Sequence, residues 1–106
     1  MTGNDRFLGM LGLARRAGRI VSGTEQVCLE MKKGGNMLVI LACDVSANTK
    51  KKVLNKTEFY GIPCICPNIN GDDIGKAVGR TNSIAAVAVK DENFSKAILN
   101  ILNDNL

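Results

Sequence analysis

The chain has 106 residues, 45% of them hydrophobic, which predicts one domain over residues 1–106 with a modest core. Its formal charge is +4, and it has no histidine, which excludes Ser-His and Cys-His catalysis and any His-ligated metal site. No apolar run approaches the length of a membrane span, and no secretory signal pattern opens the sequence, so we expect a cytoplasmic protein.

Hydrophobic spacing predicts alternating helices and strands. A 3.6-residue period marks the first helix, where Phe7, Leu11 and Ala14 share a face, and the last, where Phe94 and Ile98 do. Two apolar runs bounded by turn formers predict strands buried on both faces. In chain order we expect a helix within 4–18, an extended piece at 19–22, a helix at 23–35, a central strand at 37–43, a helix at 48–60, a short strand at 63–67, a short helix at 70–80, a strand at 83–89 and a helix capped by Asp91.

This order predicts an α/β protein. Repeated strand–helix–strand units place helices on both faces of a sheet, because the crossovers between strands run over its faces. We therefore expect a three-layer α/β/α sandwich with a small four-stranded sheet, mainly parallel or mixed.

Positive charge is concentrated in the first half of the chain. Residues 1–56 hold 10 Lys/Arg against 4 Asp/Glu, a net +6, whereas residues 57–106 hold 4 against 6, a net −2. Such asymmetry predicts one basic face, compatible with nucleic acid, acidic lipid or an acidic protein. Nucleic acid is the commonest partner of a small basic domain.

A run of lysines stands at the predicted start of the third helix, where positive charge is unfavourable. The first turn of a helix is a partial positive pole, so each cation there costs about 0.3–1 kcal/mol at low salt. The helices starting near Asp72 and Asp91 carry acids at this place instead. An anionic partner lying against Lys50, Lys51 and Lys52 would explain the exception.

Two further segments present polar groups at the start of an element. Gly23, just before the second helix, leaves backbone N–H groups open to a phosphate or a base edge. The segment GRTNS enters a buried strand and is compatible with either a ligand loop or a plain solvated turn. If these segments lie near the lysines, they form one binding edge. The polar residues of this loop are Arg80, Thr81, Asn82 and Ser83.

We predict no cofactor and no metal site. Cys28, Cys43, Cys64 and Cys66 fall inside apolar runs without a C-x-x-C knuckle, which favours reduced core thiols over zinc or disulfides. The glycines of GDDIGKAVGR lack the order of a phosphate loop, so we expect Gly75 to serve close packing.

Four segments together resemble a known family. LGLARRAGRIVSGTEQV, LVILACDVSANTKKKV, YGIPC and IGKAVGR…IAAVAV are similar in order and spacing to the bacterial YlxQ-type branch of the kink-turn-binding ribosomal proteins, relatives of the large-subunit protein L7Ae. The resemblance covers nearly the whole chain. It implies an α/β/α fold and non-enzymatic binding of a sharply bent RNA internal loop with tandem sheared G·A pairs.

The resemblance also assigns contact residues. The family's contact loop and helix start match residues 23–26, its basic helix start matches 48–52 and its final loop matches 79–83. We add Arg19, at the start of the extended piece, and Lys33, on the outward face of the second helix. The predicted RNA-binding residues are Arg19, Gly23, Thr24, Glu25, Gln26, Lys33, Asn48, Thr49, Lys50, Lys51, Lys52, Arg80, Thr81, Asn82 and Ser83.

The chain departs from its archaeal relatives at the contact helix. They usually have Asn-Glu where this chain has Glu25-Gln26, and a lysine in place of Leu29. A carboxylate accepts from a guanine amino group but cannot donate as asparagine does. We therefore expect the affinity for a standard kink-turn to be reduced or shifted to another RNA. Phe59 and Tyr60 fall at the far end of their helix, so base stacking should contribute little.

The residues also allow a different class of function. A protein-interaction module could dock an acidic partner through the basic edge, with exposed Leu29 as its anchor. A small enzyme or nucleotide-binding domain is disfavoured, because histidine and a complete phosphate loop are missing. The partner we expect is structured RNA, with ribosomal RNA among the candidates, bound by a monomer that contacts no membrane.

Overall fold

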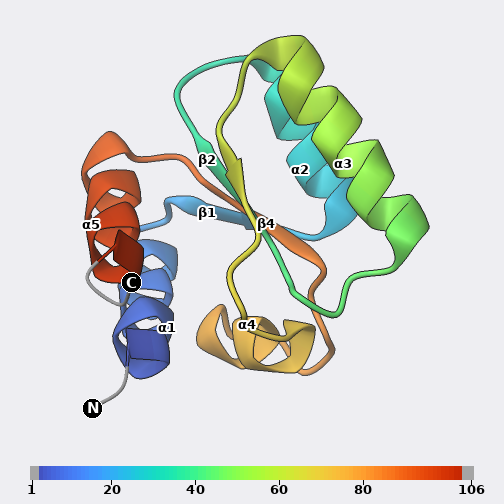
Figure 1. The fold of residues 1–106 in the computed structure, drawn as a ribbon. Coiled ribbons are helices and arrows are strands. Elements are labelled where there is room, and N and C mark those ends of the chain that lie inside the picture. Colours follow the sequence, from blue (N-terminus) through green and yellow to red (C-terminus); the bar gives the residue numbers. More distant parts are fainter. Residues whose placement is uncertain (1–2, 104–106) are drawn as a thin grey trace.

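Helices and strands alternate along the part of the chain that this computed structural model describes, residues 3–103 (Figure 1). A four-stranded sheet separates two layers of helices, as the sequence predicts. In chain order the elements are α1 (Gly3–Arg16), β1 (Ile20–Ser22), α2 (Thr24–Lys33), β2 (Leu38–Leu41), α3 (Ala47–Tyr60), β3 (Cys64–Ile65), α4 (Gly71–Ala77), β4 (Ala86–Val89) and α5 (Glu92–Asn103).

The sheet is mixed, with strand order β1-β4-β2-β3. β4 runs antiparallel to both of its neighbours, and only the β2–β3 pair is parallel. The mixed form of the prediction is therefore confirmed, and the mainly parallel form is wrong. β2 and β4 occupy the centre of the sheet, which confirms the predicted place of the apolar run that became β2.

The two central strands divide the core into two clusters. In β2, Leu38 and Ile40 pack on the side of α1, α4 and α5, whereas Val39 and Leu41 pack on the side of α2 and α3. This division follows from the alternation of side chains along a strand. All four side chains are buried, which explains why the sequence of β2 is apolar without interruption.

The end of α1 and the start of α5 lie where the sequence predicts. Phe7, Leu11 and Ala14 of α1 are buried, and Gly18 follows the helix with φ of 73°. At the start of α5, the backbone N–H of Phe94 donates to Asp91 Oδ1 at 3.0 Å. No helix within residues 3–103 is long and apolar enough to cross a membrane.

The expectation of core thiols is wrong for two of the four cysteines. Cys28 and Cys64 are half-buried, but Cys43 and Cys66 are exposed because each lies just beyond a strand, where the chain leaves the sheet. All four are free thiols, and burial raises the pKa of Cys64. Across the described residues, no three His, Cys, Asp or Glu side chains gather closely enough to hold a metal ion.

Candidate nucleic-acid interface

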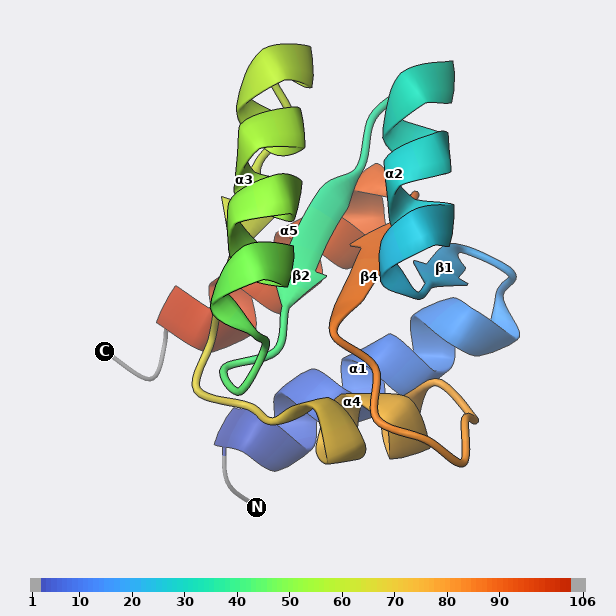
Figure 2. The same cartoon turned by 90° about the vertical axis from the view of Figure 1, so that its right-hand side faces the viewer.

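The predicted binding segments converge where β1 and β2 end and β4 begins (Figure 2). The N–H of Gly23 donates to the carbonyl of Ala86, and the N–H of Ala42 donates to the carbonyl of Ala85, both at 2.9 Å. The entry into β4 therefore lies between the start of α2 and the segment that leads to α3. We call this surface the helix-start edge and define it as residues 23–26, 46–52 and 79–85.

The start of α2 carries no side-chain cap within the described structure. Gly23 occupies the N-cap position with φ of 98° and ψ of 141°, and its carbonyl accepts the first intrahelical bond, from the N–H of Val27 at 2.9 Å. The N–H groups of the residues between them have no intrahelical acceptor. Glu25 and Gln26 are exposed beside these groups, so this turn can bind an anion or a base edge.

The start of α3, by contrast, is capped by a serine. Ser46 Oγ accepts from the N–H of Thr49 at 3.2 Å and donates to Thr49 Oγ1 at 2.9 Å. The helix begins at Ala47, one residue before the predicted start, so Lys50 is its fourth residue. Thr49, a predicted contact, therefore serves in the cap. The sequence feature that indicates this cap is Ser46, a favoured N-cap residue, three residues before Thr49 at the start of a polar run.

The three consecutive lysines of α3, Lys50 to Lys52, fan around the helix, because successive helical residues are rotated by about 100°. Lys52 lines a hollow between α2 and α3, together with Glu25 and Leu29. All three lysines are exposed, and none forms an ion pair with an aspartate or glutamate among residues 3–103. Their charge is therefore available to a partner.

The loop before β4 rests directly on α4. A side chain at Gly75 would collide with the carbonyl of Asn82, and one at Gly71 would collide with the hydroxyl of Ser83. The N–H of Arg80 donates to the carbonyl of Gly75 at 2.7 Å. Close packing at Gly75 is thus confirmed, and it leaves the polar side chains of the loop exposed at the surface.

Asp44, in the segment before α3, forms a hydrogen bond with the start of α4, on which the loop rests. Its Oδ1 accepts from the N–H of Gly71 at 2.8 Å, and the carbonyl of Gly71 in turn accepts from the N–H of Ile84 at 3.0 Å. The segment that leads to α3 and the loop before β4 are therefore joined through α4. Arg15, at the end of α1, places its guanidinium beside Gly79 and adds a cation that our predicted set lacked.

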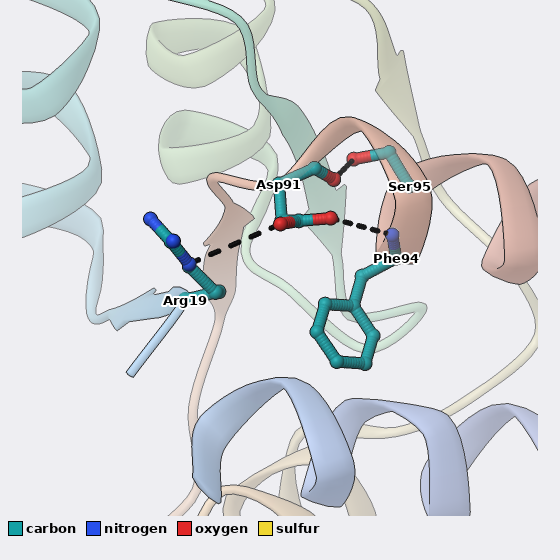
Figure 3. A network of polar contacts seen from close by, with 4 residues as sticks. All are labelled: Arg19, Asp91, Phe94 and Ser95. Atoms are coloured by element: carbon teal, nitrogen blue, oxygen red, sulfur yellow. Dashed lines mark hydrogen bonds and ion pairs between the residues drawn. The ribbon is translucent and has the colours of Figure 1, made fainter. Parts of the chain in front are cut away.

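Two predicted contacts lie at the opposite end of the sheet. Arg19 precedes β1, whereas Gly23 follows it, and Arg19 Nε lies 3.9 Å from Asp91 Oδ2 (Figure 3). Lys33 is the last residue of α2, with its Nζ 3.4 Å from Glu30 Oε1. The structure therefore does not bring these two cations to the helix-start edge, because a strand and a helix, respectively, intervene.

Glu30 is the centre of that opposite cluster. Its Oε2 lies 2.9 Å from Lys90 Nζ, and the hydrogen bond from Lys90 lowers the pKa of the Glu30 carboxyl. Lys33 adds to this effect. At this end Arg19, Lys33 and Lys90 are thus engaged with acids, unlike Lys50–Lys52 of α3.

Comparison with known proteins identifies the family of this chain. RNA-binding protein YlxQ of Bacillus subtilis (strain 168) is 34% identical over 97% of this chain and 100% of its own length. The large ribosomal subunit protein eL30 of Methanococcus vannielii is 29% identical over 82% of each chain. A solved structure of a protein of unknown function from Bacillus halodurans C superposes with a TM-score of 0.83 and 35% identity, covering 92% of this chain and 97% of that one. The profile of the ribosomal protein L7Ae/L30e/S12e/Gadd45 family matches residues 5–99, and the chain belongs to this family.

Proposed function

We propose that this protein is a non-enzymatic RNA-binding protein whose helix-start edge binds a bent, structured RNA such as a kink-turn. The observation that carries the proposal is the convergence of three segments at one end of the sheet: an uncapped helix start, three lysines without described acidic partners and a loop rich in hydrogen-bond donors. The name of the related YlxQ protein, an RNA-binding protein, supports it, and the eL30 relative makes ribosomal RNA a candidate partner.

The chemistry of each segment suits a different part of a folded RNA. Lys50, Lys51 and Lys52 offset the repulsion between phosphates that a sharp bend crowds together. Open space lies above Gly23, so a backbone can approach the first N–H groups of α2 without meeting a side chain. The Glu25 carboxylate accepts from a guanine amino group at the same turn. Recognition would then depend on shape first and on bases second.

Titration of a kink-turn RNA and a plain duplex of equal length, at several salt concentrations, tests the proposal. We expect tighter binding of the bent RNA, and an affinity for both RNAs that falls steeply as salt rises. Equal affinities for the two RNAs would overturn recognition of a bend. An affinity that does not change with salt would overturn the role of the lysines.

A further inference from the structure

The hollow between α2 and α3 continues the helix-start edge along the two helices, which lie side by side (Figure 2). At one end it is lined by Glu25 and Lys52, near the helix starts, and at the other by Tyr60, the last residue of α3. Lys32 and Lys56 line the part between them, and its volume is about 430 Å³. A ligand at the edge could therefore extend into this hollow without crossing another element.

The lining combines positive charge with an accessible aromatic ring. Three lysines face a single acid, Glu25, so the hollow attracts anions. Tyr60 is 39% exposed and forms a T-shaped pair with Phe59, with ring centroids 4.9 Å apart. Such a pair covers only one face of one ring, which leaves ring surface for another aromatic group. A basic groove with an aromatic platform is the arrangement that binds single-stranded nucleic acid.

We propose that this hollow binds a single-stranded extension of the RNA held at the helix-start edge, with a base stacked on Tyr60 and phosphates beside Lys32 and Lys56. The inference rests on the proposed function and adds a second contact site to it. It also reverses our expectation from the sequence that the aromatic residues at the end of α3 stand apart from the binding surface, because the hollow joins Tyr60 to Lys52.

An amphipathic protein helix suits the lining less well. Docking of such a helix needs a row of apolar pockets for anchors at successive turns. Four of the seven lining residues are charged, and Leu29, 53% exposed, is the single aliphatic one. The hollow therefore offers charge and stacking rather than a continuous apolar floor.

Three RNAs test the inference: a blunt kink-turn, and the same kink-turn with a short unpaired pyrimidine extension at its 5′ or its 3′ end. We expect the wild-type protein to bind one extended RNA about tenfold more tightly than the blunt one, the gain typical of one stacked base. Tyr60→Ala should abolish this gain without changing the affinity for the blunt RNA. Tyr60→Phe, which keeps the ring, should retain it.

A charge variant gives an independent test. Lys56→Gln should lower the gain from the extension, whereas Lys96→Gln, on α5 across the sheet, should leave it unchanged. Equal affinity of the wild type for blunt and extended RNAs would overturn the inference and leave the hollow to a protein segment. This failure is distinct from failure of the proposed function, in which the blunt kink-turn itself would bind no better than a duplex.

Discussion

At the scale of single residues, the backbone conformation at Gly23 shapes the contact turn. Its φ of 98° with ψ of 141° lies in a region that glycine enters freely and other residues rarely adopt. This conformation lets the chain leave β1, donate to Ala86 and begin α2 within one residue. A side chain would find space there but not an unstrained backbone.

Replacing Gly23 by alanine should therefore destabilise the protein. We expect Gly23→Ala to lower the free energy of unfolding by about 1–3 kcal/mol, the cost of a sparsely populated backbone conformation. Urea denaturation measures this change, and RNA affinity should fall with it as the first turn of α2 shifts. Gly9→Ala is the matched control, because Gly9 lies inside α1 with open space around it and no positive φ, and should raise stability by about 0.5–1 kcal/mol. Similar effects of both substitutions would contradict the assignment of strain to Gly23.

Glu30 provides a prediction about pH. Because the hydrogen bond from Lys90 lowers its pKa in the folded protein, its ion pairs stabilise the fold above the ordinary carboxyl pKa, and this contribution is lost as pH falls through the lowered pKa. Glu30→Gln should lower the free energy of unfolding by about 0.5–1 kcal/mol at neutral pH. At a pH below the lowered pKa of Glu30, the same substitution should leave the free energy of unfolding unchanged. Denaturation across the pH range measures the difference.

The matched control for this prediction is Glu92→Gln. The Glu92–Lys96 pair, at 3.3 Å, lies on exposed helix surface, where Glu92 is 65% exposed against 14% for Glu30. We expect little change in stability from this variant at any pH. If Glu30→Gln lowered the free energy of unfolding by the same amount from neutral pH to acid, the packing of the Glu30 side chain, and not its charge, would support α2.

At the scale of elements, the path of α4 explains the direction of β4. β1, β2 and β3 all run in one direction, as the strand–helix–strand pattern predicts. A parallel crossover, however, needs a connection that travels the length of the sheet and back. The seven residues of α4 cover about 10 Å, and the chain re-enters the sheet from the end that it had just left.

This reversal explains what the sequence could and could not predict. The apolar runs identified β2 and β4 and their burial, because each strand has helices on both faces. Strand direction depends on how far α4 and its loop travel, which hydrophobic spacing does not encode. Likewise, the position of Lys50–Lys52 in a helix was predictable, but the cap at Ser46 depends on the exact residue at which that helix begins. The separation of Arg19 and Lys33 from the edge depends on the three-dimensional path of the chain, which the sequence pattern does not encode.

The hydrogen bond between Asp44 and α4 should fix the loop of the edge. Asp44→Ala removes the acceptor for the Gly71 N–H and should cost about 1 kcal/mol of unfolding free energy. It should also speed hydrogen exchange of the amides at 79–85, since the loop rests on α4. Asp44→Asn keeps an oxygen at the same place and should restore most of both properties. If the asparagine variant behaved like alanine, the charge of Asp44 rather than its hydrogen bond would be responsible.

At the scale of the whole molecule, two groups of cations lie at opposite ends of the sheet and differ in their partners. The lysines of the helix-start edge have no described acidic partner, whereas Arg19, Lys33 and Lys90 pair with Asp91 or Glu30. Along α2 the two ends are about 15 Å apart, which exceeds the screening length of about 8 Å at physiological salt. The part of an RNA that is held at the helix-start edge is therefore shielded from the charge at the opposite end.

Two double variants of equal charge test this division. Lys50→Gln with Lys51→Gln should weaken RNA binding and reduce the slope of log affinity against log salt by about one for each phosphate that is no longer neutralised. Arg19→Gln with Lys33→Gln removes the same net charge from the opposite end, so the slope should stay close to that of the wild type. Thermal unfolding of each variant separates weaker binding from weaker folding, because the second pair also breaks the ion pairs to Asp91 and Glu30. With a blunt kink-turn RNA, an equal reduction of the slope in the two variants would show that the body of the bound RNA also contacts the opposite end of the sheet, which would contradict this division.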